Sequence, residues 1–190
     1  MTQHRRTQAD RREETKAKLL SAARQLFGER GYAETSLEQV AEACDMTIRP
    51  IYHYFESKLG LFTAVVDDME QERARNIENR QEAEQADIWS GFMASCEDPH
   101  FRQIILIDAP NLLRHRNAMD GAITKAARER AAKLFGRKPD GLTMNMLMGA
   151  LSNAALYIAE NGATAQDYEK IRDLIDFHSK AAVGNKGETS

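Results

Sequence analysis

The fold is decided by residues 35–58, which read TSLEQVAEACDMTIRPIYHYFESK. Thr35 and Ser36 each precede an acid or an amide by three residues, which is the arrangement of a capping box at the start of a helix. Apolar side chains then recur at three-residue and four-residue spacing as far as Cys44. This pattern predicts a short helix that ends near Cys44 and buries one face.

A second short helix is expected after a tight turn at residues 45–47. Thr47 can cap this helix, and Pro50 lies in its first turn, where a missing backbone N–H costs little. Ile51 and Phe55 are four residues apart and can both face inward. Two short helices that share one apolar face across a three-residue turn have the spacing of a helix-turn-helix.

Polar and aromatic residues occupy the other sides of this motif. In a helix-turn-helix, the second helix enters the major groove of DNA and the first crosses the phosphate backbone. Arg49 and His53 can reach base edges or phosphates, and tyrosine hydroxyls can donate to phosphate oxygens. The alternative is a plain bundle of three helices with the aromatic residues in its core. The candidate DNA-binding residues are Thr35, Ser36, Thr47, Arg49, Pro50, Tyr52, His53, Tyr54 and Lys58.

A longer helix is expected on each side of the motif. Residues 10–27 carry one buried face, and Gly28 and Gly31 supply stop signals after it. Ser57 can cap a helix that begins at Lys58 and becomes almost wholly charged beyond Glu70. The predicted inner positions of the two helices are Leu19, Leu20, Ala23, Leu26, Phe27, Leu61, Phe62, Val65 and Met69.

The rest of the chain predicts helices as well, which makes the protein all-α. Ile104 to Ile107 form an apolar run that fits either a helix or a buried strand, and Pro110 is expected to break the chain. A tail at residues 184–190 is expected to be disordered. The predicted helices cover residues 88–96, 100–107, 118–135, 142–160 and about 164–182.

Charge and composition limit the class of protein. The 190 residues carry a net charge of −3, which excludes a uniformly basic coat for nucleic acid. Residues 1–18, however, hold six cationic side chains against three acidic ones, and this basic arm is either a DNA contact or a frayed terminus. Cys44 and Cys96 are too few for a disulfide framework or a four-ligand zinc site. Uninterrupted apolar runs are too short to span a bilayer, and no signal peptide is visible, so a cytoplasmic protein without membrane contact is expected.

Three runs of residues point to a known family. Residues 19–32 read LLSAARQLFGERGY, residues 35–41 read TSLEQVA and residues 51–58 read IYHYFESK. In this order and at this spacing they resemble the N-terminal signature of the TetR (tetracycline repressor) family of regulators. The sequence departs from the family pattern at Arg49 and Pro50, on the predicted reading helix, so no relative's operator sequence carries over.

The C-terminal part is similar to one branch of the family's effector domains at residues 101–110 (FRQIILIDAP) and 147–156 (LMGALSNAAL). The resemblance implies a helical domain that dimerises through its last two helices and takes a small molecule among its middle helices. Small residues on the helix at 142–160 would also permit the close approach of a partner helix. Dimer-interface candidates are Gly149, Ser152, Leu156, Tyr168, Ile171 and Ile175, and effector-pocket candidates are Trp89, Phe92, Met93, Met144 and Met148, any of which could instead be plain core.

The sequence therefore predicts three parts and one function. Residues 1–58 would form the helix-turn-helix domain with its basic arm, residues 59–183 the effector and dimerisation domain, and residues 184–190 the tail. The expected function is that of a homodimeric repressor, released from a near-palindromic DNA operator by a small-molecule effector. The alternative is a TetR-like DNA-binding protein without a small-molecule ligand, controlled by a protein partner or acting as an activator. No catalytic motif, metal site or cofactor is expected.

Overall fold

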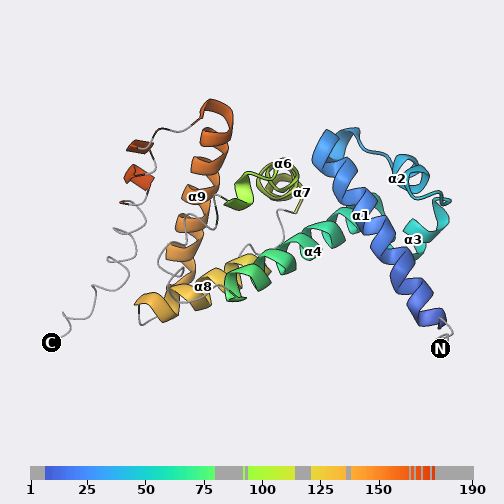
Figure 1. Cartoon of the computed structure of the whole chain (residues 1–190), viewed down its shortest axis with the longest axis horizontal. Helices are drawn as coiled ribbons and strands as arrows, with labels where there is room; N and C mark the ends of the chain where they lie inside the picture. Colours follow the sequence, from blue (N-terminus) through green and yellow to red (C-terminus); the bar gives the residue numbers. More distant parts are fainter. Residues whose placement is uncertain are drawn as a thin grey trace, which may run out of the picture. The chain divides into compact units, whose positions relative to one another are not determined.

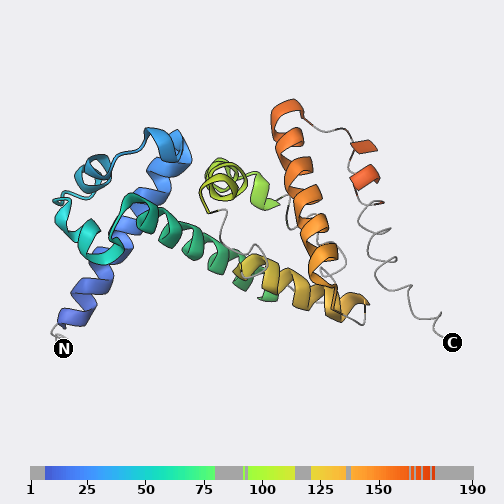
Figure 2. The same ribbon diagram turned by 180° about the vertical axis from the view of Figure 1, so that it is seen from behind.

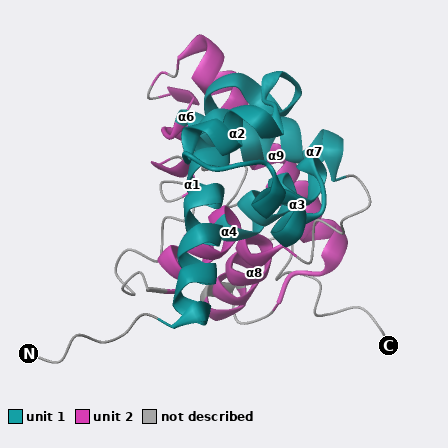
Figure 3. Ribbon diagram, turned by 90° about the vertical axis from the view of Figure 1, so that its right-hand side faces the viewer, with its two compact units in different colours: residues 1–68, 99–113 teal, residues 69–98, 114–190 magenta. Residues whose placement is uncertain are grey.

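The computed structural model describes residues 7–79, 92, 94–113, 121–135, 138–162, 164, 166–167, 169–171 and 173. Every secondary-structure element in this part of the chain is a helix (Figure 1). The chain divides into two compact units, residues 1–68 with 99–113 and residues 69–98 with 114–190 (Figure 3).

The first unit begins with a long helix, α1 (Gln8–Glu34). Thr7 and Asp10 form a capping box at its start, since each side chain accepts the other residue's backbone N–H. The predicted stop at Gly31 is a kink within the helix, where φ is +79°, a value that glycine adopts without steric cost. One further turn follows the kink and brings the chain to Thr35.

Two short helices follow, α2 (Leu37–Ala43) and α3 (Arg49–Phe55), and both lie beside α1 (Figures 1 and 2). Ser36 makes the predicted capping box, in which its N–H donates to Gln39 Oε1 at 2.8 Å and its Oγ accepts the Gln39 N–H at 3.2 Å. Thr47 was predicted to cap the second helix, and this prediction is wrong. The N-cap is Ile48, which makes no side-chain capping bond.

Helix α4 (Lys58–Asn79) starts at the predicted cap, where Ser57 Oγ accepts the N–H of Gly60 at 3.0 Å. Gly60 is required at this corner, because a Cβ there would lie 1.9 Å from the carbonyl oxygen of Phe55. The core of the unit is built from α1 to α4 with the predicted spacing, although Leu20 and Leu26 are only half-buried. Its fully or almost fully buried apolar residues are Leu19, Ala23, Phe27, Leu37, Val40, Ala41, Ile51, Phe55, Leu61, Phe62, Val65 and Val66.

A later segment completes the first unit. It consists of three consecutive helical pieces, α6 (Pro99–Phe101), the π-helix η2 (Arg102–Asp108) and α7 (Ala109–Leu112). Of these, α6 and η2 pack against α1. The apolar run at residues 104–107 is thus helical rather than a strand. Pro110 does not break the chain as predicted, because it lies in the first turn of α7, where no helical hydrogen bond from its nitrogen is needed.

The second unit contains the later part of α4 with α8 (Ala122–Phe135) and α9 (Gly141–Asn161). Glu70 on α4 accepts the N–H of Ala122 at 3.0 Å, and Arg130 on α8 donates to the carbonyl of Ile77 at 2.9 Å. The predicted helix at residues 142–160 is confirmed and is one residue longer at each end. Its N-cap is Asp140, whose carboxylate accepts the N–H of Thr143 at 2.9 Å.

Helix α9 is also long and apolar enough to cross a membrane by length and composition, with a mean hydropathy of 1.2 over 18 residues, of which 17% are buried. The prediction from uninterrupted runs missed it, because small and polar residues interrupt the apolar ones along this helix. Apolar helices in the cores and interfaces of soluble proteins can have the same length and composition, so α9 is not assigned to a membrane.

Candidate nucleic-acid interface

Helix α3 presents most of the predicted reading residues to solvent. Ile51 and Phe55 are 0% and 6% exposed and fix the rotation of this short helix about its axis. Arg49, Tyr52 and His53 are exposed as a consequence, with Tyr52 at 52%. Pro50 and Tyr54 are half-buried, Thr47 in the preceding turn is exposed, and the His53 and Tyr54 rings meet edge to face at 4.9 Å.

An open groove of about 450 Å³ lies beside this helix. It brings Ser36, at the start of α2, together with Tyr52 of α3 and Lys58 of α4, three residues that the sequence analysis proposed for DNA contact. Glu34 and Glu38 also line the groove, so its charge is mixed. The full lining is Ala33, Glu34, Thr35, Ser36, Leu37, Glu38, Gln39, Tyr52 and Lys58.

Lys58 is held in place by the end of α1. Its Nζ lies 4.3 Å from the centroid of the Tyr32 ring and donates to the carbonyl oxygen of Ala33 at 3.3 Å. The Tyr32 ring packs edge to face against Phe62, at 5.2 Å between centroids, and burial raises the pKa of its hydroxyl. The ammonium group therefore has a defined position at the rim of the groove.

Thr35 also lines the groove, but its hydroxyl is bound within the fold. Its side chain is 1% exposed, and its hydroxyl lies 3.1 Å from the carbonyl oxygen of Leu26 and 2.9 Å from that of Gly31. Both carbonyl groups belong to α1, one at the kink and one five residues before it. Thr35 stabilises the join between α1 and α2, and its hydroxyl is not available to a DNA phosphate.

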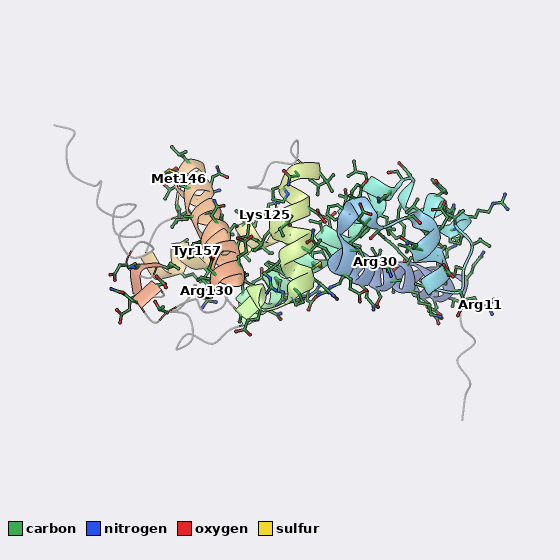
Figure 4. All side chains as sticks on the ribbon, turned by 90° about the horizontal axis from the view of Figure 1, so that it is seen from above. Arg11, Arg30, Lys125, Arg130, Met146 and Tyr157 are labelled. Carbon is green, nitrogen blue, oxygen red and sulfur yellow. The ribbon has the colours of Figure 1, made fainter. Side chains whose placement is uncertain are left out.

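Within the described residues, the basic arm belongs to α1 from Gln8 onward. Arg11 and Arg12 are exposed in its first turns, and Lys16 is half-buried (Arg11 is labelled in Figure 4). Lys18 forms an exposed ion pair with Glu14 at 3.3 Å. Arg5 and Arg6 lie outside the described residues.

Among the described residues, neither the cysteines nor the potential metal ligands form a second site. Burial raises the pKa of the Cys44 thiol above its usual value, and neighbouring Asp45 raises it further, while Cys96 is buried. Within the described residues, no group of three or more His, Cys, Asp or Glu side chains could hold a metal ion.

The predicted effector and dimer residues lie in the second unit. Met144 is buried, and Met148 and Phe92 are half-buried; Trp89 and Met93 lie outside the described residues. Gly149 is exposed, and Ser152, Leu156 and Ile171 are half-buried; Tyr168 and Ile175 lie outside the described residues.

Three exposed apolar residues of α9 were not among the predicted site residues. Leu142 is 70% exposed, Met146 54% and Tyr157 62% (Met146 and Tyr157 are labelled in Figure 4). Leu142 and Met146 are four residues apart, and Tyr157 extends the same helical spacing through Gly149 and Asn153. That spacing was the signal that could have identified them, but only exposure distinguishes this face from the buried one.

Known proteins share both parts of this arrangement. Residues 19–65 match the model of bacterial regulatory proteins of the tetR family, and residues 86–177 match that of the tetracyclin repressor-like C-terminal domain. The HTH-type transcriptional regulator UidR of Escherichia coli K12 is 34% identical over 62 residues, which are 32% of this chain and 32% of UidR. The matched segment thus covers about a third of the length of this curated relative.

Solved structures match over almost the whole chain. A TetR-family transcriptional regulator from Pectobacterium atrosepticum is 26% identical, with a TM-score of 0.60 over 90% of this chain and 95% of that one. RolR in complex with its ligand resorcinol is 19% identical, with a TM-score of 0.59 over 96% of this chain and all of the other. With the helix-turn-helix and the helical C-terminal part both matched, this chain belongs to the TetR family of DNA-binding transcriptional regulators.

Proposed function

We propose that this chain is a repressor that binds a near-palindromic operator as a homodimer, with α3 of each subunit in a major groove. The observation that carries this proposal is the division of α3 into a buried side, Ile51 and Phe55, and an exposed side, Arg49, Tyr52 and His53. A recognition helix needs this division, because one side must hold the domain together while the other meets base edges. The two half-sites are expected about one helical turn apart or somewhat more.

Phosphate contacts would surround the reading helix. Ser36, Tyr54 and Lys58 would meet the backbone beside α3 together with Tyr52, and Thr47 and Pro50 would lie close to it. Arg11, Arg12 and Lys16 would follow the backbone from the first turns of α1. Each such contact releases counterions, so the affinity should fall steeply as salt rises.

The dimer would form through α9 and the helix after it. The exposed apolar residues Leu142, Met146 and Tyr157 support this, because monomeric soluble proteins rarely leave such a face uncovered. Gly149 lies between them and would let a partner helix approach closely. Ser152, Leu156 and Ile171 would complete the interface, and the proposed occupant is a second copy of this chain, as family members dimerise.

A small-molecule effector would bind within residues 59–183. The match to the tetracyclin repressor-like C-terminal domain supports this, as does the complex of the structural neighbour RolR with resorcinol. Met144, Met148 and Phe92 are the described candidates for the pocket wall. Effector binding would favour a dimer whose reading heads are too far apart for the two grooves and so lower DNA affinity. We place this regulator in the cytoplasm and assign it no catalytic activity.

The first experiment measures DNA binding by fluorescence anisotropy. Purified protein is titrated onto duplexes tiled across the DNA that flanks its own gene, at two salt concentrations and with random duplex as competitor. Tight binding to one near-palindromic tile would support a local repressor. If every tile binds as weakly as random DNA, the titration is repeated after denaturing and refolding the protein to remove a co-purified inducer.

Two variants separate base reading from phosphate contact. Arg49→Ala is expected to change the preference among single-base variants of the bound tile, whereas Tyr52→Phe should weaken binding to all duplexes by a similar factor. Lys125→Ala, which removes an exposed cation from α8, is the control for loss of charge alone. Equal losses on matched and mismatched tiles for Arg49→Ala would exclude a base-reading role for this residue.

A second experiment distinguishes the effector from a protein partner. A ligand that binds only the folded state raises the melting temperature in proportion to the logarithm of its concentration. A screen of small apolar and phenolic compounds, resorcinol among them, should therefore find compounds that raise the melting temperature and release the bound tile. Absence of any such compound would favour control by a protein partner.

A further inference from the structure

One carboxylate ties the end of α1 to the segment at residues 99–113 within the first unit. Asp108, the last residue of η2, accepts the backbone N–H of Tyr32 through Oδ2 at 2.9 Å. The same oxygen accepts Nε2 of Gln103 at 3.2 Å. Tyr32 directly follows the kink at Gly31, where the non-helical backbone turns the next N–H out of the regular helical ladder.

The π-helix is what places Asp108 and Gln103 together. Its hydrogen bonds join residues five apart, as in the bond from the N–H of Ala109 to the carbonyl of Ile104. Residues five apart lie far around a regular α-helix but close together around this wider one.

From Tyr32 the contacts lead to the groove. Nζ of Lys58 lies over the Tyr32 ring, 4.3 Å from its centroid. The same Nζ donates to the carbonyl oxygen of the next residue, Ala33, at 3.3 Å. The two groups that hold the ammonium therefore belong to Tyr32, whose N–H is bound by Asp108, and to Ala33, the next residue. Lys58 lines the groove with Ser36 and Tyr52.

We propose that Asp108 is a positioning residue for DNA binding. By holding the N–H of Tyr32, it fixes the last turn of α1, and this turn places the Lys58 ammonium for a DNA phosphate. Asp108 itself does not touch DNA in this arrangement. The inference rests on the proposed function, because it requires Lys58 to contact a phosphate.

The test compares two substitutions that remove the same charge. Asp108→Ala removes the acceptor for the Tyr32 N–H, whereas Asp108→Asn keeps an oxygen that can accept it. The probe is a fluorescent duplex enriched by the wild-type full-length protein from a random-sequence pool. We expect about tenfold weaker DNA binding for Asp108→Ala, which is the effect of losing one hydrogen bond to a charged group, here that of the Lys58 ammonium to a phosphate. For Asp108→Asn we expect DNA binding to weaken by less than about threefold.

A double-mutant cycle separates positioning from general damage to the fold. In a Lys58→Met background the ammonium is absent, so Asp108→Ala should then weaken binding by less than about twofold. The slope of log affinity against log salt should also fall in Asp108→Ala toward its value in Lys58→Met. Glu70→Ala, which removes a carboxylate that accepts the backbone N–H of Ala122 in the second unit, is the matched control and should leave both quantities unchanged.

Three outcomes would overturn the inference. The first is a loss for Asp108→Ala that is equally large with and without the Lys58 ammonium, which would indicate a general structural role. The second is wild-type affinity for Asp108→Ala. The third is a wild-type protein that enriches no duplex, which would overturn the proposed function as well and so is distinguishable from the first two.

Discussion

Helices α1 and α9 are both long, with 27 and 21 residues, yet they use their apolar side chains in opposite ways. Helix α1 is largely polar, and its apolar residues Leu19, Ala23 and Phe27 are completely buried. Helix α9 has no charged side chain before Glu160, yet its residues Leu142, Met146 and Tyr157 are more than half exposed. The more apolar helix is thus the one whose apolar face a single chain leaves open.

This difference shows in which part of the molecule a single chain buries its own apolar side chains. The core around α1 joins residues from α1, α2, α3 and α4 and completely buries Leu19, Phe27, Val40, Ile51, Leu61 and Phe62. A large exposed apolar face, in contrast, is informative because single exposed residues are common and contiguous ones are rare. The composition of α9 therefore reflects surface that a second molecule is proposed to cover, and the predictions below test this interpretation.

The largest effect is expected from Phe62→Ala. Phe62 is 0% exposed, and its ring meets those of Phe27 and Tyr32 at 5.3 and 5.2 Å. Truncating a buried phenylalanine costs about 3–5 kcal/mol, so the free energy of unfolding in urea should fall by this amount. Phe62→Leu, which keeps most of the volume, should cost less than half as much. A loss below about 1 kcal/mol for Phe62→Ala would show that this core is not closed within one chain.

Met146→Glu should act on association and leave the fold of the single chain intact. A carboxylate at this position would be solvated in the monomer but buried without a partner in the dimer. We expect the dimer dissociation constant, measured by sedimentation velocity, to rise at least about a hundredfold, or about 2.7 kcal/mol.

Lys125→Gln is the control for Met146→Glu, because it changes the net charge by the same one unit at an exposed position of α8. It should leave the dimer dissociation constant unchanged. Unchanged dimerisation in Met146→Glu would instead place the interface elsewhere.

Gly149→Ala should stabilise the monomer but destabilise the dimer. Nothing lies within 4 Å of a Cβ added at Gly149 in the single chain, and replacing glycine by alanine inside a helix gains up to about 1 kcal/mol. In the Met146→Glu background the variant should therefore raise the free energy of unfolding. In the wild-type background the added methyl group should weaken the dimer if a partner helix packs at Gly149. Stabilisation in both backgrounds would contradict close approach at this position.

Sequence alone identified the parts of the fold that depend on neighbouring residues. The capping box of Ser36 with Gln39 and the cap of Ser57 join residues three apart, so their pattern is visible in the chain. The inner positions of α1 to α4 follow from helical periodicity in the same way, and the structure confirms most of them.

The missed features depend on contacts between distant residues or on backbone changes without a local signature. Thr35 looked like a cap, but its hydroxyl contacts two carbonyl groups of α1 instead. The hydrogen bond from Tyr32 to Asp108 joins residues that are 76 positions apart, and no local sequence pattern near either residue predicts it. The exposed apolar face of α9 could not be predicted for another reason. Hydropathy indicates which side chains avoid water, but it does not indicate whether the same chain or a second molecule covers them.

The smallest effect concerns the start of α9 and its dependence on pH. Hydrogen bonds from the backbone N–H and hydroxyl of Thr143 lower the pKa of Asp140 in the folded protein. Its ionised form therefore adds stability above about pH 4, the ordinary range of an aspartate, and this contribution is lost as the pH falls through the lowered pKa. Asp140→Asn keeps a capping oxygen but cannot titrate. The melting temperature of the wild type should thus fall slightly relative to this variant between pH 5 and 3, and parallel pH profiles would show that the cap makes no net ionic contribution to α9.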